Sequence, residues 1–189
     1  MANATTHTTD SARTVSQTAK SQGLVDVTSL VLLAVLLAAG FILNITVGNA
    51  FAMIGIKPQF IIAAYTLTVL ITRATLPQAL VYGLVSAAVI QFSTSIPGLN
   101  FLTEGLAAMV AALFVKTQLS VGGRDMLPLV GAFVTTLVSG ALFAVLGTVL
   151  MGAALPTALA KVPVVLGTAV FNALVVQALF FPLRKVLNR

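Results

Sequence analysis

Six long apolar stretches, separated by short breaks, follow a polar first segment of the chain. They cover residues 24–47, 58–72, 77–95, 101–119, 126–152 and 162–183. A bilayer core of ~30 Å needs about 20 helical residues to cross it, whereas a membrane-barrel strand is shorter and alternates in polarity. The stretches therefore predict membrane-spanning helices. The second stretch is short for a span, so we expect it either to tilt into protein contacts or to begin inside the preceding loop.

The breaks between the stretches carry the residues of turns. They are Gly48-Asn49, Lys57-Pro58, Arg73 to Pro77, Pro97 to Asn100, Gly122 to Asp125, and Pro156 to Pro163. The sequence thus predicts an all-α membrane protein, a compact bundle of six transmembrane helices within residues 23–189. Residues 1–22 are rich in Ser and Thr with almost no apolar side chains, which predicts a disordered leader. The apolar run that follows is longer than that of a cleaved signal peptide.

Composition supports a membrane environment. Hydrophobic residues make up 59% of the 189 positions and charged residues only 7%, whereas a soluble domain carries roughly 25% charged residues. A soluble fold of this size cannot hide so much apolar surface.

The few charges predict the orientation of the chain. With six spans, both termini and the basic residues Arg13, Lys20, Arg73, Lys116, Arg124, Arg184, Lys185 and Arg189 fall on one side. Only Lys57 and Lys161 fall on the other. Because cytoplasmic loops are enriched in Lys and Arg, we expect both termini in the cytoplasm. The net charge of +6 is then explained by topology, and we expect no nucleic-acid partner.

The chemistry of the chain argues against an enzyme. It has no cysteine and a single histidine, His7, which lies in the polar leader. It has no phosphate-binding G-x-x-x-x-G-K-[ST] loop, and its four acidic residues form no pair for acid–base or metal-assisted catalysis. We expect no metal and no cofactor. Inverted repeats and buried coupling carboxylates, typical of secondary transporters, are not evident either. These observations indicate a binding subunit that takes its energy from partner proteins.

Polar residues on the non-cytoplasmic side are the candidates for a ligand pocket. We select residues at the ends of the spans and two deeper side chains: Asn44, Lys57, Gln59, Tyr65, Gln91, Asn100, Glu104 and Asn172. Glu104 either binds ligand or complements the dipole of its helix, with Asn100 or Thr103 as the N-cap. Lys57 either pairs with an anionic ligand group or extends to lipid headgroups. The amides either contact ligand or hydrogen-bond a neighbouring helix.

A second feature is a face of small residues in the first stretch. Ala34 and Ala38 are four residues apart and allow close approach of another helix. This helix belongs either to a partner protein or to the same chain.

These features and several short motifs together resemble a known family. The motifs are Gly40-Phe41-Ile42-Leu43, Gly55-Ile56-Lys57-Pro58-Gln59, Phe92-Ser93-Thr94-Ser95-Ile96-Pro97-Gly98, Thr136-Leu137-Val138-Ser139-Gly140 and the run Gly167 to Asn172. Over about residues 28–185 the chain resembles the S components of energy-coupling factor (ECF) transporters. It is most similar to the tryptophan-transporter branch. It departs from these relatives at Gln59, where they carry an acidic residue.

The resemblance implies a function and partners. An S component binds a nutrient near the outer face of a prokaryotic plasma membrane, and its alanine face, here Ala34 and Ala38, docks on a transmembrane coupling protein driven by two ATPases. Tryptophan would find an opposite-charge pair in Lys57 and Glu104, and apolar walls in Phe60, Phe92 and Phe101. Other amino acids or a small vitamin would use the same groups. The other hypotheses are a structural membrane subunit that binds no solute and a stand-alone facilitator.

Overall fold

The structure, a computed structural model, describes residues 24–53, 56–121 and 123–187. The predicted leader, residues 1–22, lies outside the described residues. The elements are α1 (Val27–Leu43), the π-helical turn η1 (Asn44–Gly48), α2 (Asn49–Ala52), α3 (Phe60–Thr72), α4 (Leu76–Ile90), α5 (Leu99–Phe114), β1 (Ser120–Val121), β2 (Arg124–Asp125), α6 (Leu127–Leu150), α7 (Pro156–Leu159) and α8 (Val162–Val186). Apart from the short antiparallel pair β1–β2, the described fold is all-α, as predicted.

All six apolar stretches are largely helical, but two predicted breaks are misplaced. Of the break predicted from Pro156 to Pro163, residues 156–159 form α7 and α8 begins at Val162, whereas residues 151–155 are not helical. The other misplaced break is Gly48-Asn49. The chain continues as one helical segment through Gly48-Asn49 to Ala52. Gly48 has ordinary helical angles, φ −59° and ψ −42°, and a Cβ at this position would lie 3.3 Å from the carbonyl oxygen of Pro58. Asn49 donates from its side chain to the carbonyl of Ile45, 2.9 Å away, one turn back. Glycine here permits a close approach between chain segments and does not form a turn.

Local capping explains where several helices begin and end. The side chain of Asp26 accepts from the backbone N–H of Ser29 and caps α1. Thr75 and Gln78 form a capping box at the start of α4, in which the Thr75 N–H donates to Gln78 Oε1 at 2.9 Å. Arg73 adopts the left-handed conformation, φ 51°, and ends α3. The predicted break from Arg73 to Pro77 is therefore confirmed.

Helix α3 forms the centre of the bundle. It contacts α1, α4, α5, α6 and α8, and every residue from Phe60 to Ile71 is buried. A helix that is apolar on all sides is expected to be enclosed by other helices. At 13 residues it is about 20 Å long, which is short for a bilayer core. The protein contacts expected for this stretch are thus present.

The helices differ in length, and this bears on the membrane. Three segments, Val27–Ala52, Leu127–Leu150 and Pro156–Val186, are long and apolar enough to cross a membrane. Helices α3, α4 and α5 are apolar but shorter, with 13, 15 and 16 residues. Helices α4 and α5 are shorter than their apolar stretches because residues 91–98 and 115–119 leave the helical conformation.

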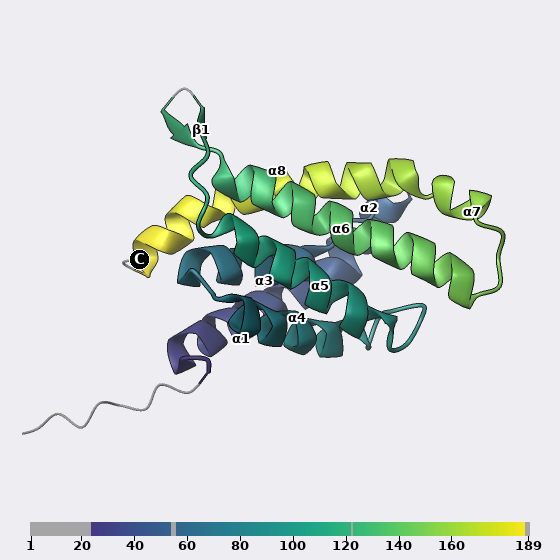
Figure 1. Ribbon diagram of the computed structural model, residues 1–189, viewed down its shortest axis with the longest axis horizontal. Helices are drawn as coiled ribbons and strands as arrows, with labels where there is room; N and C mark the ends of the chain where they lie inside the picture. The colour runs from purple at the N-terminus through teal and green to yellow at the C-terminus, as the bar shows by residue number, and fades with distance from the viewer. Residues whose placement is uncertain (1–23, 54–55, 122, 188–189) are drawn as a thin grey trace, which may run out of the picture.

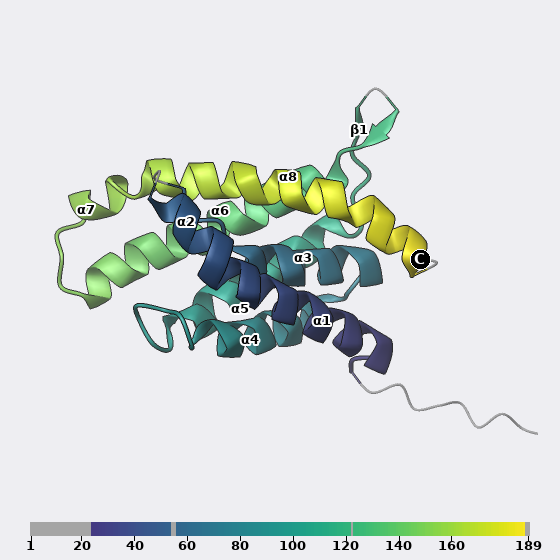
Figure 2. The same ribbon diagram turned by 180° about the vertical axis from the view of Figure 1, so that it is seen from behind.

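The two views of the bundle place the start of α1 and the end of α8 at the same end (Figures 1 and 2). Helices α3 and α5 begin at the opposite end. The elements place most basic residues at the end shared by the first and last helices: Arg73, Lys116, Arg124, Arg184 and Lys185. Lys57 and Lys161 precede α3 and α8 at the opposite end. The basic residues are therefore segregated along the bundle.

Candidate ligand-binding cavity

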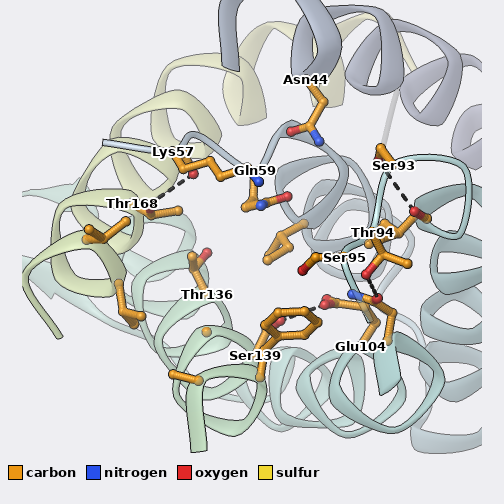
Figure 3. Close-up of a pocket in the computed structure, with 18 of the residues that line it drawn as sticks. Asn44, Lys57, Gln59, Ser93, Thr94, Ser95, Glu104, Thr136, Ser139 and Thr168 are labelled. Carbon is orange, nitrogen blue, oxygen red and sulfur yellow. Dashed lines mark hydrogen bonds between the residues drawn. The ribbon is translucent and has the colours of Figure 1, made fainter. Parts of the chain in front are cut away.

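A cavity of about 510 Å³ opens at the end of the bundle where α3 begins. Its walls come from η1, the segment before α3, the α4–α5 connection, and helices α5, α6 and α8 (Figure 3). Polar side chains supply much of the lining: Asn44, Asn49, Lys57, Gln59, Ser93, Thr94, Ser95, Asn100, Glu104, Thr136, Ser139, Lys161 and Thr168. Pockets for small molecules typically measure 300–1,000 Å³, so the cavity has the size of a small-molecule site.

The structure brings together five of the eight predicted site residues. Asn44, Lys57, Gln59, Asn100 and Glu104 all line the cavity, although they come from three separate parts of the chain. The sequence predicted them as site residues because they are polar and lie at the same end of the apolar stretches. The other three predicted residues, Tyr65, Gln91 and Asn172, are not among the lining residues.

Glu104 is buried at the cavity wall, with only 2% of its surface exposed. Its Oε2 accepts from the hydroxyl of Tyr65 at 2.9 Å, and its Oε1 accepts from Ser139 at 2.7 Å and from Thr103 at 3.3 Å. Figure 3 shows the carboxylate directed toward the interior of the cavity. Three hydroxyls from three helices thus fix its orientation.

Two expectations about Glu104 are corrected by this geometry. Helix α5 is capped by Gly98 and begins at Leu99, so neither Asn100 nor Thr103 is the N-cap. Glu104 is the sixth residue of α5, beyond the first turn where the helix dipole favours an acid. The sequence showed no evident buried coupling carboxylate, whereas the structure buries Glu104 between α5, α3 and α6.

Lysines approach the cavity from the segments that precede α3 and α8. The backbone carbonyl of Lys57 accepts from the Thr168 hydroxyl at 3.0 Å, which ties the segment before α3 to α8. The Lys161 ammonium donates to the Thr148 hydroxyl at 3.2 Å. Both lysines and Glu104 line the cavity, so the lining contains two cationic side chains and one carboxylate.

The three predicted residues outside the lining have structural contacts. Asn172 is fully buried, and its Nδ2 donates to the Gln59 carbonyl at 3.0 Å and to the Thr136 hydroxyl at 3.3 Å. Gln91 accepts from the Gly98 N–H at 2.9 Å and holds the α4–α5 connection. Tyr65 reaches the site only through Glu104. Each of these side chains supports a segment or a residue that lines the cavity.

Sequence reasoning missed the contribution of α6. Thr136, Ser139 and Phe143 line the cavity, and their spacing of three and four residues places them on one helix face. A polar pair at this spacing within an apolar stretch is the signal that marks them. The predicted aromatic walls are not found: Phe60, Phe92 and Phe101 are absent from the lining, and Phe92 is 84% exposed.

The small-residue face of α1 is exposed. Both Ala34 and Ala38 lie on the outside of the described bundle, as do Val31, Val35 and Ile42 on the same side of the helix. The buried side of α1 carries Leu33, Leu37 and Gly40. Packing within the described chain therefore does not account for Ala34 and Ala38.

Comparisons with protein-family models, with curated proteins and with solved structures find no match for this chain. Functional inference therefore rests on the site itself. Within the described residues, no group of three or more His, Cys, Asp or Glu side chains is arranged to hold a metal ion. The arrangement can bind a small polar molecule through charges of both signs, hydroxyls and amides.

Proposed function

We propose that this protein is the substrate-binding membrane subunit, the S component, of an ECF-type nutrient importer, with tryptophan or a related amino acid as its ligand. The observation that carries the proposal is the cavity of about 510 Å³, which combines Glu104 with Lys57 and Lys161 inside an apolar helix bundle. A zwitterion carries one positive and one negative group, so a lining with both signs of charge complements it.

Two further observations support the partners of such a subunit. The chain has no phosphate-binding loop, which agrees with a subunit whose transport energy comes from other proteins. The exposed Ala34 and Ala38 offer a surface that a coupling-protein helix can approach closely. The coupling protein and two ATPases are thus the proposed partners.

The charge distribution supports a multi-pass arrangement in the plasma membrane. The basic residues gather at the end where α1 begins and α8 ends, and Lys and Arg favour the cytoplasmic side. We therefore propose that both termini lie in the cytoplasm and that the cavity opens to the outside. In this arrangement α3, α4 and α5 also lie at membrane depth, with the short α3 enclosed by the other helices.

Tryptophan binding can be measured directly, because the chain contains no tryptophan of its own. Purified protein in detergent is titrated with tryptophan, and ligand fluorescence and calorimetry report the complex. We expect saturable binding with one site per chain, and competition by related amino acids. Failure of tryptophan, other amino acids and vitamins to give saturable binding would refute the proposal and favour a structural subunit.

Uptake measurements separate the S component from a stand-alone facilitator. Cells that express this chain with a complete coupling module should accumulate radiolabelled tryptophan, and cells that lack the module should not. The double variant Lys57→Ala/Glu104→Ala should abolish uptake at normal expression. Equal uptake with and without the coupling module contradicts the assignment.

A further inference from the structure

Glu104 is a buried acid whose partners in the described protein are all neutral. The hydroxyls of Tyr65, Thr103 and Ser139 donate to its oxygens, and the Asn100 side chain also interacts with it. Among the described residues, no lysine or arginine forms an ion pair with it. A buried carboxylate is stable when an opposite charge compensates it, and neutral donors compensate only part of the loss of water.

The cavity is a route by which a compensating charge can reach Glu104. Glu104 lines the cavity and its carboxylate is directed into it (Figure 3), while the other sides of the carboxylate face α3 and α6 through Tyr65 and Ser139. A cation that enters the cavity would therefore contact the carboxylate without displacing any of the hydroxyls.

The lining also contains a buried acceptor that has no donor. The Oδ1 atom of Asn44 is buried, and within the described residues it has no hydrogen-bond partner. Buried polar atoms without partners are rare in folded proteins and call for a missing ligand or water. The cavity thus offers one unpaired acceptor from η1 and, from α5, a carboxylate whose hydrogen-bond donors are all neutral.

From this geometry we propose that Glu104 is the counter-ion of an ammonium group on the ligand, so that the cavity selects amines over the same molecules without the amine. Tyr65, Thr103 and Ser139 are positioning residues, because they hold the carboxylate and leave its charge uncompensated. This inference deepens and rests on the proposed function: it narrows the ligand class to solutes that carry a cationic amine. The ligand carboxylate, where present, is left to Lys57 and Lys161.

Three indole compounds test whether the cavity selects ligands that carry an amine. Tryptophan has both charged groups, tryptamine keeps only the amine, and indole-3-propionate keeps only the carboxylate. We expect the wild-type protein to bind tryptophan and tryptamine, and to bind indole-3-propionate roughly 10- to 100-fold more weakly than tryptophan, since a hydrogen bond to a charged group is lost. Equal affinity for tryptophan and indole-3-propionate overturns the inference.

The variant Glu104→Gln tests whether the charge of Glu104 binds the ligand ammonium. Glutamine has the shape of a protonated glutamate but no charge, so the two amines should lose roughly 10- to 100-fold in affinity. Indole-3-propionate should bind Glu104→Gln at least as well as wild type. If Glu104 has a purely structural role, the variant should bind all three ligands more weakly by the same factor. If the affinity for tryptophan is unchanged, Glu104 binds the ligand in its neutral form. Either result overturns the inference. Asp125→Asn, the same chemical change at the opposite end of the bundle, is the matched control.

Thermal unfolding of the ligand-free protein gives a test that does not depend on the ligand. Because the charge is uncompensated in the empty cavity, Glu104→Gln should raise the unfolding midpoint above that of wild type, and Asp125→Asn should not. A lower midpoint for Glu104→Gln shows that the carboxylate is needed by its hydroxyl donors, and overturns the inference. If wild type binds none of the indoles but Glu104→Gln is stabilised, tryptophan is refuted as the ligand while the uncompensated charge is supported.

Discussion

Gly83 permits the close packing of α4 against α5 beside the cavity, and its replacement tests the link between packing and site. A Cβ at position 83 would lie 2.6 Å from the backbone oxygen of Glu104 and 2.8 Å from the Cβ of Ala108. Ordinary contacts begin at 3.4 Å, so the helices have to separate by several tenths of an ångström. Both obstructing atoms are parts of rigid structure. We expect Gly83→Ala to lower the free energy of unfolding by about 1–3 kcal/mol and to weaken ligand binding, since α5 carries Glu104.

The matched control is Gly105→Ala, which adds the same methyl group at the same helix pair. There the Cβ would meet only the side-chain ends of Leu80 at 3.2 Å and Leu84 at 3.6 Å, and flexible side chains can move aside. Because alanine favours a helix interior by about 0.5–1 kcal/mol over glycine, we expect this variant to be neutral or slightly more stable than wild type. Thermal unfolding followed by circular dichroism, together with ligand titration, measures both. Equal behaviour of the two variants, or an unperturbed Gly83→Ala, would refute the steric reasoning.

Other predictions address the docking face, the cavity support and the fold. Ala34→Trp should block uptake but leave ligand affinity unchanged, because Ala34 is exposed and does not line the cavity; uptake that survives contradicts the docking role. Asn172→Leu should weaken ligand binding roughly 10-fold by freeing the Gln59 carbonyl, and unchanged affinity would count against this support. Gln177→Ala should lower the free energy of unfolding by about 1–3 kcal/mol with normal ligand affinity, because its side chain accepts from the Leu129 N–H and donates to the Asp125 carbonyl, both at 2.9 Å.

The helices could be predicted because local sequence determines them. The capping box at Thr75 and Gln78 and the apolar stretches themselves are readable without tertiary information. The error at Gly48 has a tertiary cause: its lack of a side chain serves the approach of Pro58, a segment ten residues away. A single sequence does not distinguish a glycine that permits a close contact from a glycine that forms a turn.

The site could be predicted only in part, for a similar reason. Lys57, Gln59 and Glu104 stood out because charged and amide groups are rare in this chain. Asn172 stood out equally, yet its amide holds the Gln59 backbone instead of facing the cavity. Polarity indicates that a buried side chain has a partner, but the sequence does not say whether the partner is a ligand or the backbone of another segment.

The location of the cavity follows from the unequal lengths of the helices. Helix α3 has 13 residues, while α6 has 24 and α8 has 25, so at ~1.5 Å per residue the central helix is more than 15 Å shorter than its neighbours. The segment before α3 is held to α8 by the bonds from Thr168 to the Lys57 carbonyl and from Asn172 to the Gln59 carbonyl. The space left at the start of α3 is thus a property of the backbone. Substitutions of lining side chains such as Glu104 should therefore change which ligand the cavity prefers without moving the cavity.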